Sequence, residues 1–367
     1  MINKKRLINE FCNYVKINSE SGNEGSLYNK LLQDVKELGF TVITDNAGEK
    51  CGSNANNIYA VLQGDNTKKS RFTVCHMDTV SYGGTINPII GEQYITSDGT
   101  TILSADDKSA IAAFLEAVRC LKENNIPHRT IEVVFTIGEE QGLIGAQNFD
   151  TSVIKSKEGL VFDISKSPNY IISHSPYKTK FDVTLQGKSA HAGINPEDGI
   201  SAAIIFANAV SKMKLLRVDD ETTANIGYVY GGTGSNVVMS KLIAKCEVRS
   251  INKEKHDKQL AHMIETFKNT ATHLGGSAEI KITNKYPGYK ISKDSKNLKI
   301  ISEIISSMGK EVKLISSGGG SDANIFISKG FDVLNIGTGM ENIHSNQERI
   351  NINDFVFMAE LIYNYFK

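Results

Sequence analysis

Short apolar runs alternate with segments of helical periodicity in the first half of the chain. Four runs predict strands, at residues 57–64, 71–75, 130–137 and 159–163. Residues 107–125 predict a helix, because its apolar side chains recur every three or four positions. These apolar side chains are Ile111, Phe114, Leu115, Val118 and Leu121. Strands that alternate with helices predict an open α/β sheet with mostly parallel strands.

The middle of the chain predicts a different order of elements, β-α-β-β-α-β. The segments are strand 178–187, helix 199–213, strands 224–232 and 237–250, helix 253–275 and strand 277–286. This order is that of the ferredoxin-like split motif. We therefore expect an inserted α+β domain, a lid or dimerisation domain, at about residues 176–287. The helix and strand alternation then resumes, so residues 1–175 and 288–367 are expected to form one catalytic domain.

The composition and charge of the chain indicate which kinds of binding partner to expect. The 367 residues suffice for two domains, and 40% hydrophobic with 22% charged residues is ordinary for a globular protein. Lys plus Arg equals Asp plus Glu, at 41 each, which argues against nucleic acid or an anionic membrane as main partner. The start of the chain lacks the apolar core of a secretory signal, and no CxxC pair occurs among five cysteines. We expect reduced thiols and a cytoplasmic location.

Each of five ligand-type side chains falls just after a short apolar run that predicts a strand. They are His76, Asp106, Glu140, Asp163 and His344. In open α/β sheets, ligands collect beyond the carboxyl ends of the strands, and we expect all five side chains there. Two histidines and three carboxylates suit two divalent ions, zinc or else cobalt or manganese. A second carboxylate, Glu139, stands beside Glu140 and is able to act as a base on metal-bound water. This combination indicates hydrolysis.

Each of these residues also has a structural interpretation. A single histidine at a strand end is usually structural, but Asp78 follows His76 by two residues and can accept a hydrogen bond from the other ring nitrogen. Asp106 could simply cap the following helix. Glu139 and Glu140 would mean little in a solvated loop. On a buried strand end, however, two adjacent carboxylates are unfavourable without a cation.

The motifs HMDTV, SADDKSAIAA, GEEQGLIGA, GKSAHAG, GGTGSNVV, GGGSDAN and ENIHSN occur in this order along nearly the whole chain. The series resembles the di-metal aminoacylase/carboxypeptidase family of peptidases, and most of all its peptidase T (tripeptide aminopeptidase) branch. The resemblance implies that Asp106 bridges two metals. It pairs Glu140 with His344 on one metal and His76 with Asp163 on the other, and it makes Glu139 the base. A catalytic α/β domain interrupted by a small α+β domain is implied as well.

Three residues of the insert are candidates for substrate contact. The resemblance implies that His191 stabilises the tetrahedral oxyanion and that Asn236 and Arg249 bind the carboxylate end of the substrate. Each also has a plain interpretation, as an exposed turn histidine, a turn asparagine and an exposed strand arginine. Relatives that dimerise through the insert make a homodimer compatible with this resemblance.

The resemblance implies a metal-dependent exopeptidase that cleaves short peptides at the amino end. An N-acyl amino acid deacylase or a dipeptidase of the same family would use the same chemistry with another pocket. A non-catalytic metal-binding scaffold is the alternative of a different class. The presence of Glu139 and of all five ligand-type residues argues against it.

Overall fold

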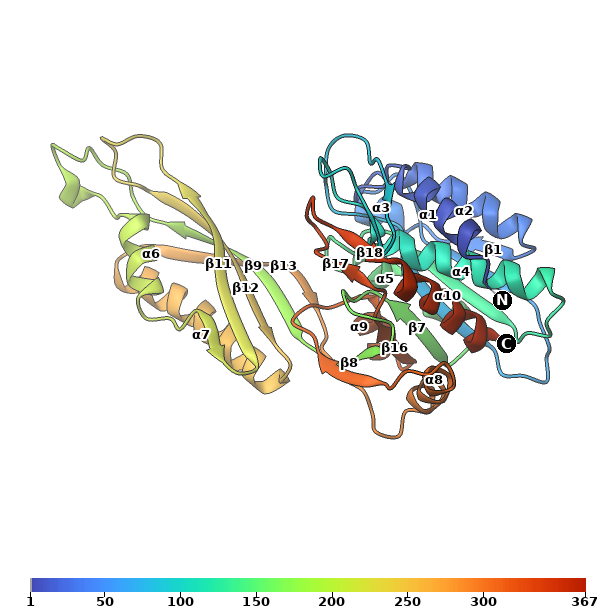
Figure 1. Ribbon diagram of the computed structural model, residues 1–367. Coiled ribbons are helices and arrows are strands. Elements are labelled where there is room, and N and C mark those ends of the chain that lie inside the picture. Colours follow the sequence, from blue (N-terminus) through green and yellow to red (C-terminus); the bar gives the residue numbers. More distant parts are fainter. Residues whose placement is uncertain (1) are drawn as a thin grey trace. The chain divides into compact units, whose positions relative to one another are not determined.

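The computed structural model describes residues 2–367, and the chain forms two compact units (Figure 1). The first unit comprises Met1–Ser173, Lys290–Ser317 and Ser321–Lys367, and the second comprises His174–Tyr289 and Gly318–Gly320. All five cysteines are free thiols. Among residues 2–367, no helix is both long and apolar enough to cross a membrane.

A nine-stranded mixed sheet forms the centre of the first unit, in the order β1-β2-β6-β3-β7-β16-β8-β14, with β15 paired to β8. Its strands are β1 (Thr41–Thr44), β2 (Ile58–Leu62), β3 (Arg71–His76), β6 (Ile131–Thr136), β7 (Glu158–Phe162), β8 (Tyr170–Ser175), β14 (Tyr289–Lys290), β15 (Lys313–Ser316) and β16 (Asp332–Ile336). The central strands β6, β3, β7 and β16 are parallel, whereas β2 pairs antiparallel with β6 and β1 pairs antiparallel with β2. The predicted α/β class with a mostly parallel sheet is confirmed.

Helices pack against this sheet, which explains why every residue of β6 is buried. The helices of the first unit are α1 (Lys4–Val15), α2 (Gly25–Glu37), α3 (Ala47–Cys51), α4 (Ala105–Glu123), α5 (Ile144–Asn148), α8 (Lys296–Ser307), α9 (Asp322–Ser328) and α10 (Ile352–Phe366). The α4 helix contacts β3, α1 and α10, while α9 contacts β7 and β16. All five apolar side chains that predicted α4 are fully buried, so the helical periodicity identified the core face correctly.

A second, small sheet in the first unit was not predicted, because its strands are only two or three residues long. Its order is β17-β18-β5-β4. The strands are β4 (Ile89–Ile90), β5 (Tyr94–Thr96), β17 (Met340–Glu341) and β18 (Arg349–Asn351). Because β18 pairs with β5, the chain near residue 350 lies beside the chain near residue 95. This pairing brings two distant segments of the sequence together.

The second unit is an antiparallel sheet with two helices. Its elements are β9 (Tyr177–Gln186), α6 (Ala202–Val210), β10 (Leu216–Asp219), β11 (Thr222–Gly231), β12 (Lys241–Ser250), α7 (Lys253–His273) and β13 (Ser277–Tyr286). The strand order β10-β11-β12-β9-β13 is the ferredoxin-like order with β10 added at the edge. Alternate residues of β9, among them Phe181 and Val183, are buried in one core with Phe267 of α7. The predicted inserted α+β fold is confirmed, and the short β10 is the strand that the pattern did not predict.

Candidate metal centre

Three of the ligand-type residues follow neighbouring parallel strands. His76 is the last residue of β3, Asp163 follows β7 directly, and Glu140 follows β6 after a tight turn. Because β6, β3 and β7 are adjacent and parallel, their carboxyl ends share one edge of the sheet. The turn after β6 requires Gly138, whose φ of 58° is in the left-handed region.

Asp106 and His344 reach the same place by another route. Asp106 lies in the first turn of α4, and His344 lies in the loop between β17 and β18. The expectation that each ligand directly follows a strand is therefore wrong for Asp106, which lies in a helix, whereas His344 follows the two-residue strand β17. The pairing of β18 with β5 aligns their two segments instead, and periodicity does not reveal strands of two or three residues.

The side chains converge on the carboxylate of Asp106. Its Oδ1 lies 3.0 Å from Nε2 of His76, and its Oδ2 lies 3.2 Å from Nε2 of His344. The same nitrogen of His344 lies 2.7 Å from Oε1 of Glu140. Asp163 has a ligand-type oxygen within 4.8 Å of ligand-type atoms of His76 and Glu139. Thus one oxygen of Asp106 faces each histidine, which is the arrangement that a bridging carboxylate requires.

The hydrogen bonding of His76 shows that this cluster suits a cation. The Nδ1 atom of His76 lies 2.9 Å from the carbonyl oxygen of Asp78, which can only accept, so Nδ1 carries a proton. In the protonated ring Nε2 donates to the carboxylate of Asp106, whereas in the neutral ring its lone pair points at that carboxylate. Two acceptors facing each other repel unless a proton or a metal ion lies between them. A divalent ion suits this position. In metal-binding histidines, a hydrogen bond from the ring nitrogen that does not bind the metal fixes the tautomer in the same way.

The charges of the buried carboxylates support the same conclusion. Burial, and then the charge of Asp106, raises the pKa of Asp163 well above its usual range. Burial and the charge of Asp163 do the same to the pKa of Glu139. Burial also acts on Asp106, but hydrogen bonds from His344 and His76 outweigh it and lower its pKa. Hydrogen bonds with Asp106 and Glu140 raise the pKa of His344 to about 10. Positive charge is in short supply here, and divalent ions would provide it.

Asp78 does more than its position beside His76 suggested. Its carboxylate lies 3.4 Å from Nδ1 of His76, farther than its own carbonyl oxygen. The carboxylate accepts hydrogen bonds from the backbone N–H groups of Glu139 (2.9 Å) and Glu140 (3.1 Å), and from the hydroxyl of Ser21. Asp78 therefore holds the backbone that carries the two adjacent glutamates.

Two residues that support the site were not identified from the sequence. The carboxylate of Asp107 accepts the backbone N–H of His76 at 3.2 Å. The side chain of Asn335 on β16 accepts the backbone N–H of Asp163 at 3.1 Å and donates to the carbonyl oxygen of the same residue. The adjacent aspartates of the SADDKS motif were a signal for Asp107. The sequence contained no comparable signal for Asn335.

The three candidate substrate residues belong to the second unit. His191 is exposed, its Nδ1 accepts the backbone N–H of Gly193, and its backbone forms an isolated bridge with Val237. Asn236 lies in the adjoining turn, where its carbonyl oxygen accepts the N–H of Ala192. His191 and Asn236 are therefore in neighbouring turns of one unit. The side chain of Arg249 on β12 donates to the carboxylate of Glu247 and to the carbonyl oxygen of Gly318.

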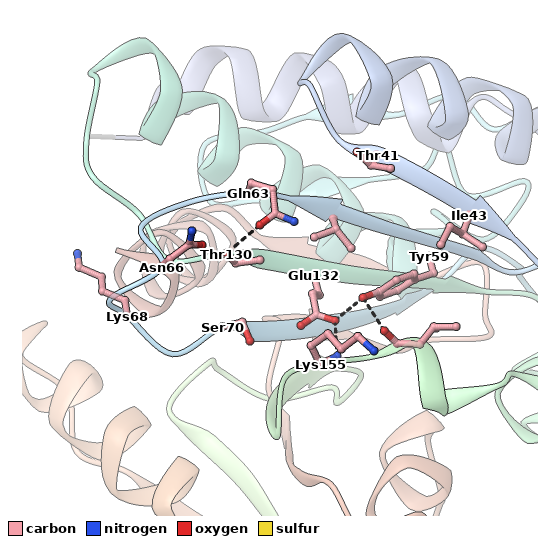
Figure 2. A pocket seen from close by; sticks show the side chains of 12 residues that line it. Thr41, Ile43, Tyr59, Gln63, Asn66, Lys68, Ser70, Thr130, Glu132 and Lys155 are labelled. Atoms are coloured by element: carbon pink, nitrogen blue, oxygen red, sulfur yellow. Dashed lines mark hydrogen bonds between the residues drawn. The ribbon is translucent and has the colours of Figure 1, made fainter.

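A separate pocket lies over β1, β2 and β6, and Figure 2 shows the side chains that line it. Glu132, near the start of β6, is buried here and accepts hydrogen bonds from the hydroxyl of Tyr59 and from the backbone N–H of Lys155. None of the ligand-type residues lines this pocket. Its place near the amino end of β6 separates it from Glu139 and Glu140, which follow the carboxyl end.

A cluster of histidines and carboxylates beyond parallel strands, in a chain with an inserted antiparallel unit, defines a metal-dependent hydrolase. The model of the peptidase family M20/M25/M40 matches residues 73–367, and the chain belongs to this family. It is 40% identical to the uncharacterized protein YqjE of Bacillus subtilis (strain 168), over 99% of this chain and 98% of that one.

Two solved structures are similar over the whole chain. The aminopeptidase PepT from Bacillus cereus ATCC 10987 has a TM-score of 0.90 and 39% identity, and covers 100% of this chain and 98% of its own. A tripeptidase from Staphylococcus aureus has a TM-score of 0.95 and 38% identity with the same coverage. The resemblance that the motifs indicated, to the di-metal peptidases and their peptidase T branch, is confirmed.

Proposed function

We propose that this chain is an exopeptidase that removes the amino-terminal residue from short peptides, tripeptides first. The observation that carries the proposal is the convergence of both histidines on the carboxylate of Asp106, with Glu139 and Glu140 beside it. The similarity to a PepT aminopeptidase and to a tripeptidase supports the choice of substrate.

Two divalent ions fit the cluster, and we assign them to zinc, with cobalt or manganese as alternatives. His76 and Asp163 would hold one ion, Glu140 and His344 the other, and Asp106 both. The ions would polarise the scissile carbonyl and favour deprotonation of the attacking water. The supporting contacts to Asp78, Asp107 and Asn335 keep the ligand-bearing backbone in place before a substrate arrives.

Glu139 is assigned as the general base. It takes a proton from the attacking water and delivers it to the amine that leaves when the peptide bond breaks. Glu139 is only 8% exposed, so it is largely shielded from bulk water. Burial opposes its ionised form, and nearby divalent charge favours it, so the two effects together can bring the pKa of Glu139 toward the working pH.

His191, Asn236 and Arg249 are assigned to substrate contact. An exposed imidazole on a turn is accessible to a ligand, and a donor aimed at developing negative charge acts mainly on the transition state. Arg249 offers a planar fork suited to the carboxylate end of a peptide. Two of its donors already bind Glu247 and Gly318, so a substrate would engage the remaining ones.

A homodimer through the second unit is part of the proposal. On β11 the residues Tyr228, Val229 and Tyr230 are exposed, and β10 pairs only with the first residues of this strand. Exposed apolar side chains along a strand edge favour association. Sedimentation of the wild type and of a Tyr228→Lys variant tests this: a dimer lost in the variant supports the interface, whereas a monomeric wild type removes it.

The function is tested with a panel of tripeptides, dipeptides and N-acyl amino acids, each with zinc, cobalt or manganese. Release of the amino-terminal residue from tripeptides in preference to the other substrates is expected. A preference for N-acyl amino acids or for dipeptides would establish the corresponding alternative. Metal binding without turnover of any member would favour a non-catalytic scaffold. Glu139→Gln serves as the inactive control, which excludes a contaminating peptidase.

A further inference from the structure

A buried carboxylate outside the ligand set joins two segments of the metal centre. Glu348 follows His344 by four residues in the loop before β18, and it is 1% exposed. Its Oε2 accepts the backbone N–H groups of Leu103 (2.8 Å) and Ser104 (2.9 Å). Its Oε1 accepts those of Ala105 (2.8 Å) and Asp106 (3.2 Å). One side chain therefore binds four successive N–H groups.

Three of these groups, those of Ser104, Ala105 and Asp106, lie at the N-cap and the first two positions of α4, where a helix leaves N–H groups without helical partners, and Leu103 precedes the cap. Ser104 occupies the N-cap position of α4, but its side chain makes no cap hydrogen bond, and its φ of 65° is unusual for a residue other than glycine. Glu348 supplies the acceptors instead, from more than 240 positions further along the chain. An ordinary serine cap would hold the helix, but it would not connect α4 to the loop of His344.

That connection runs between two of the proposed ligands. Asp106 is the last residue whose N–H binds Glu348, and its Oδ2 lies 3.2 Å from Nε2 of His344. The Glu348 carboxylate and the His344–Asp106 contact therefore join the same two segments at two points. Without the hydrogen bonds to Glu348, the backbone of Asp106 would be free to rotate. The two carboxylate oxygens of Asp106 would then lose their alignment with His76 and His344.

We propose that Glu348 is a positioning residue of the metal centre, which fixes residues 103–106 so that the Asp106 carboxylate faces both His76 and His344. This inference rests on the metal roles assigned to Asp106 and His344 under the proposed function. It assigns to Glu348 no contact with metal or substrate. Supporting residues of this kind change metal affinity by about 10–100-fold when they are replaced.

The test replaces Glu348 with glutamine, which keeps the size but turns two of the four acceptor positions into donors. A matched control is Glu132→Gln. Glu132 is also 1% exposed and also accepts two backbone N–H groups, those of Lys155 and Ser156, but it lies in the pocket of Figure 2. Both variants should lower the melting temperature of the metal-free protein. Only a positioning residue should alter the metal site.

Metal affinity is measured by titrating the metal-free proteins with zinc in competition with a chromophoric chelator. The coordination geometry is measured from the visible absorption of the cobalt-loaded proteins. Glu348→Gln is expected to raise the zinc Kd at least about tenfold and to change the cobalt spectrum, with both unchanged in Glu132→Gln. If Glu348→Gln does not fold, Glu348→Asp keeps the charge with a shorter reach and should show the same effects in smaller measure.

A zinc Kd and a cobalt spectrum like those of the wild type in a Glu348 variant would overturn the inference and leave Glu348 as a helix cap. This outcome is distinguishable from failure of the proposed function. A wild-type protein that binds metal but cleaves no peptide would refute the function, while the affinities of the variants would still decide the role of Glu348.

Discussion

Replacing Glu139 with glutamine separates base catalysis from metal binding. The amide has the size of the carboxylate but cannot take the proton of the attacking water. The backbone of residue 139 is held by Asp78, at 2.9 Å from its N–H, so the turn after β6 should keep its shape. A positioned general base contributes roughly 10²–10⁴-fold to rate, and we expect turnover to fall by about that factor.

The stability of the metal-free variant provides a second measurement. Burial raises the pKa of Glu139 in the folded protein above its unfolded value, so the folded state binds this proton more tightly. Its contribution to stability is present below the unfolded pKa and is lost as the pH rises through the folded pKa. Glutamine has no such titration. The metal-free variant should therefore melt at pH 7 no lower than the metal-free wild type.

The assay is steady-state kinetics on the best tripeptide at saturating metal, together with the metal content of each protein. Glu140→Gln is the matched control, because Glu140 contacts His344 and is assigned to a metal. It should raise the metal Kd, whereas Glu139→Gln should bind metal as the wild type does. Turnover by Glu139→Gln equal to that of the wild type would refute the assignment of the base.

Three further predictions concern the metals, the second unit and pH. Chelation of the metal should abolish turnover and lower the melting temperature. Metal added at about 1,000 times its Kd should raise the free energy of unfolding by about 4 kcal/mol. A melting curve that does not change on chelation would contradict the metal site. His191→Ala should lower kcat by roughly 100-fold with little change in substrate affinity, and unchanged turnover would exclude the oxyanion role. Hydrogen bonds with Asp106 and Glu140 raise the pKa of His344 to about 10, so in the metal-free protein its contribution to stability is full below about 6.5 and lost as the pH rises through about 10. Urea unfolding across this range should show the loss, and His344→Ala should flatten it.

The order of apolar and polar residues was sufficient to predict most of the long helices and strands of this protein. Five apolar positions at helical spacing predicted the α4 helix, because such spacing marks the buried face of a helix. Continuous apolar runs predicted the central strands, because a strand in the middle of a covered sheet is buried on both faces. The order of elements in the second unit was predicted in the same way. The motifs further indicated which histidines and carboxylates to consider, since the chemistry of a ligand resides in its side chain.

Only the tertiary structure decided how those side chains meet. Strands β5 and β18 are three residues long and carry no periodic signal, yet their pairing brings the segment of His344 beside that of Asp106. The roles of Glu348 and Asn335 depend on hydrogen bonds to backbone groups more than 170 residues away. Every residue type except proline offers a backbone N–H, so no sequence pattern marks the partner. The identities of the ligands were thus determined locally, while their alignment depended on contacts that form only when the chain has folded.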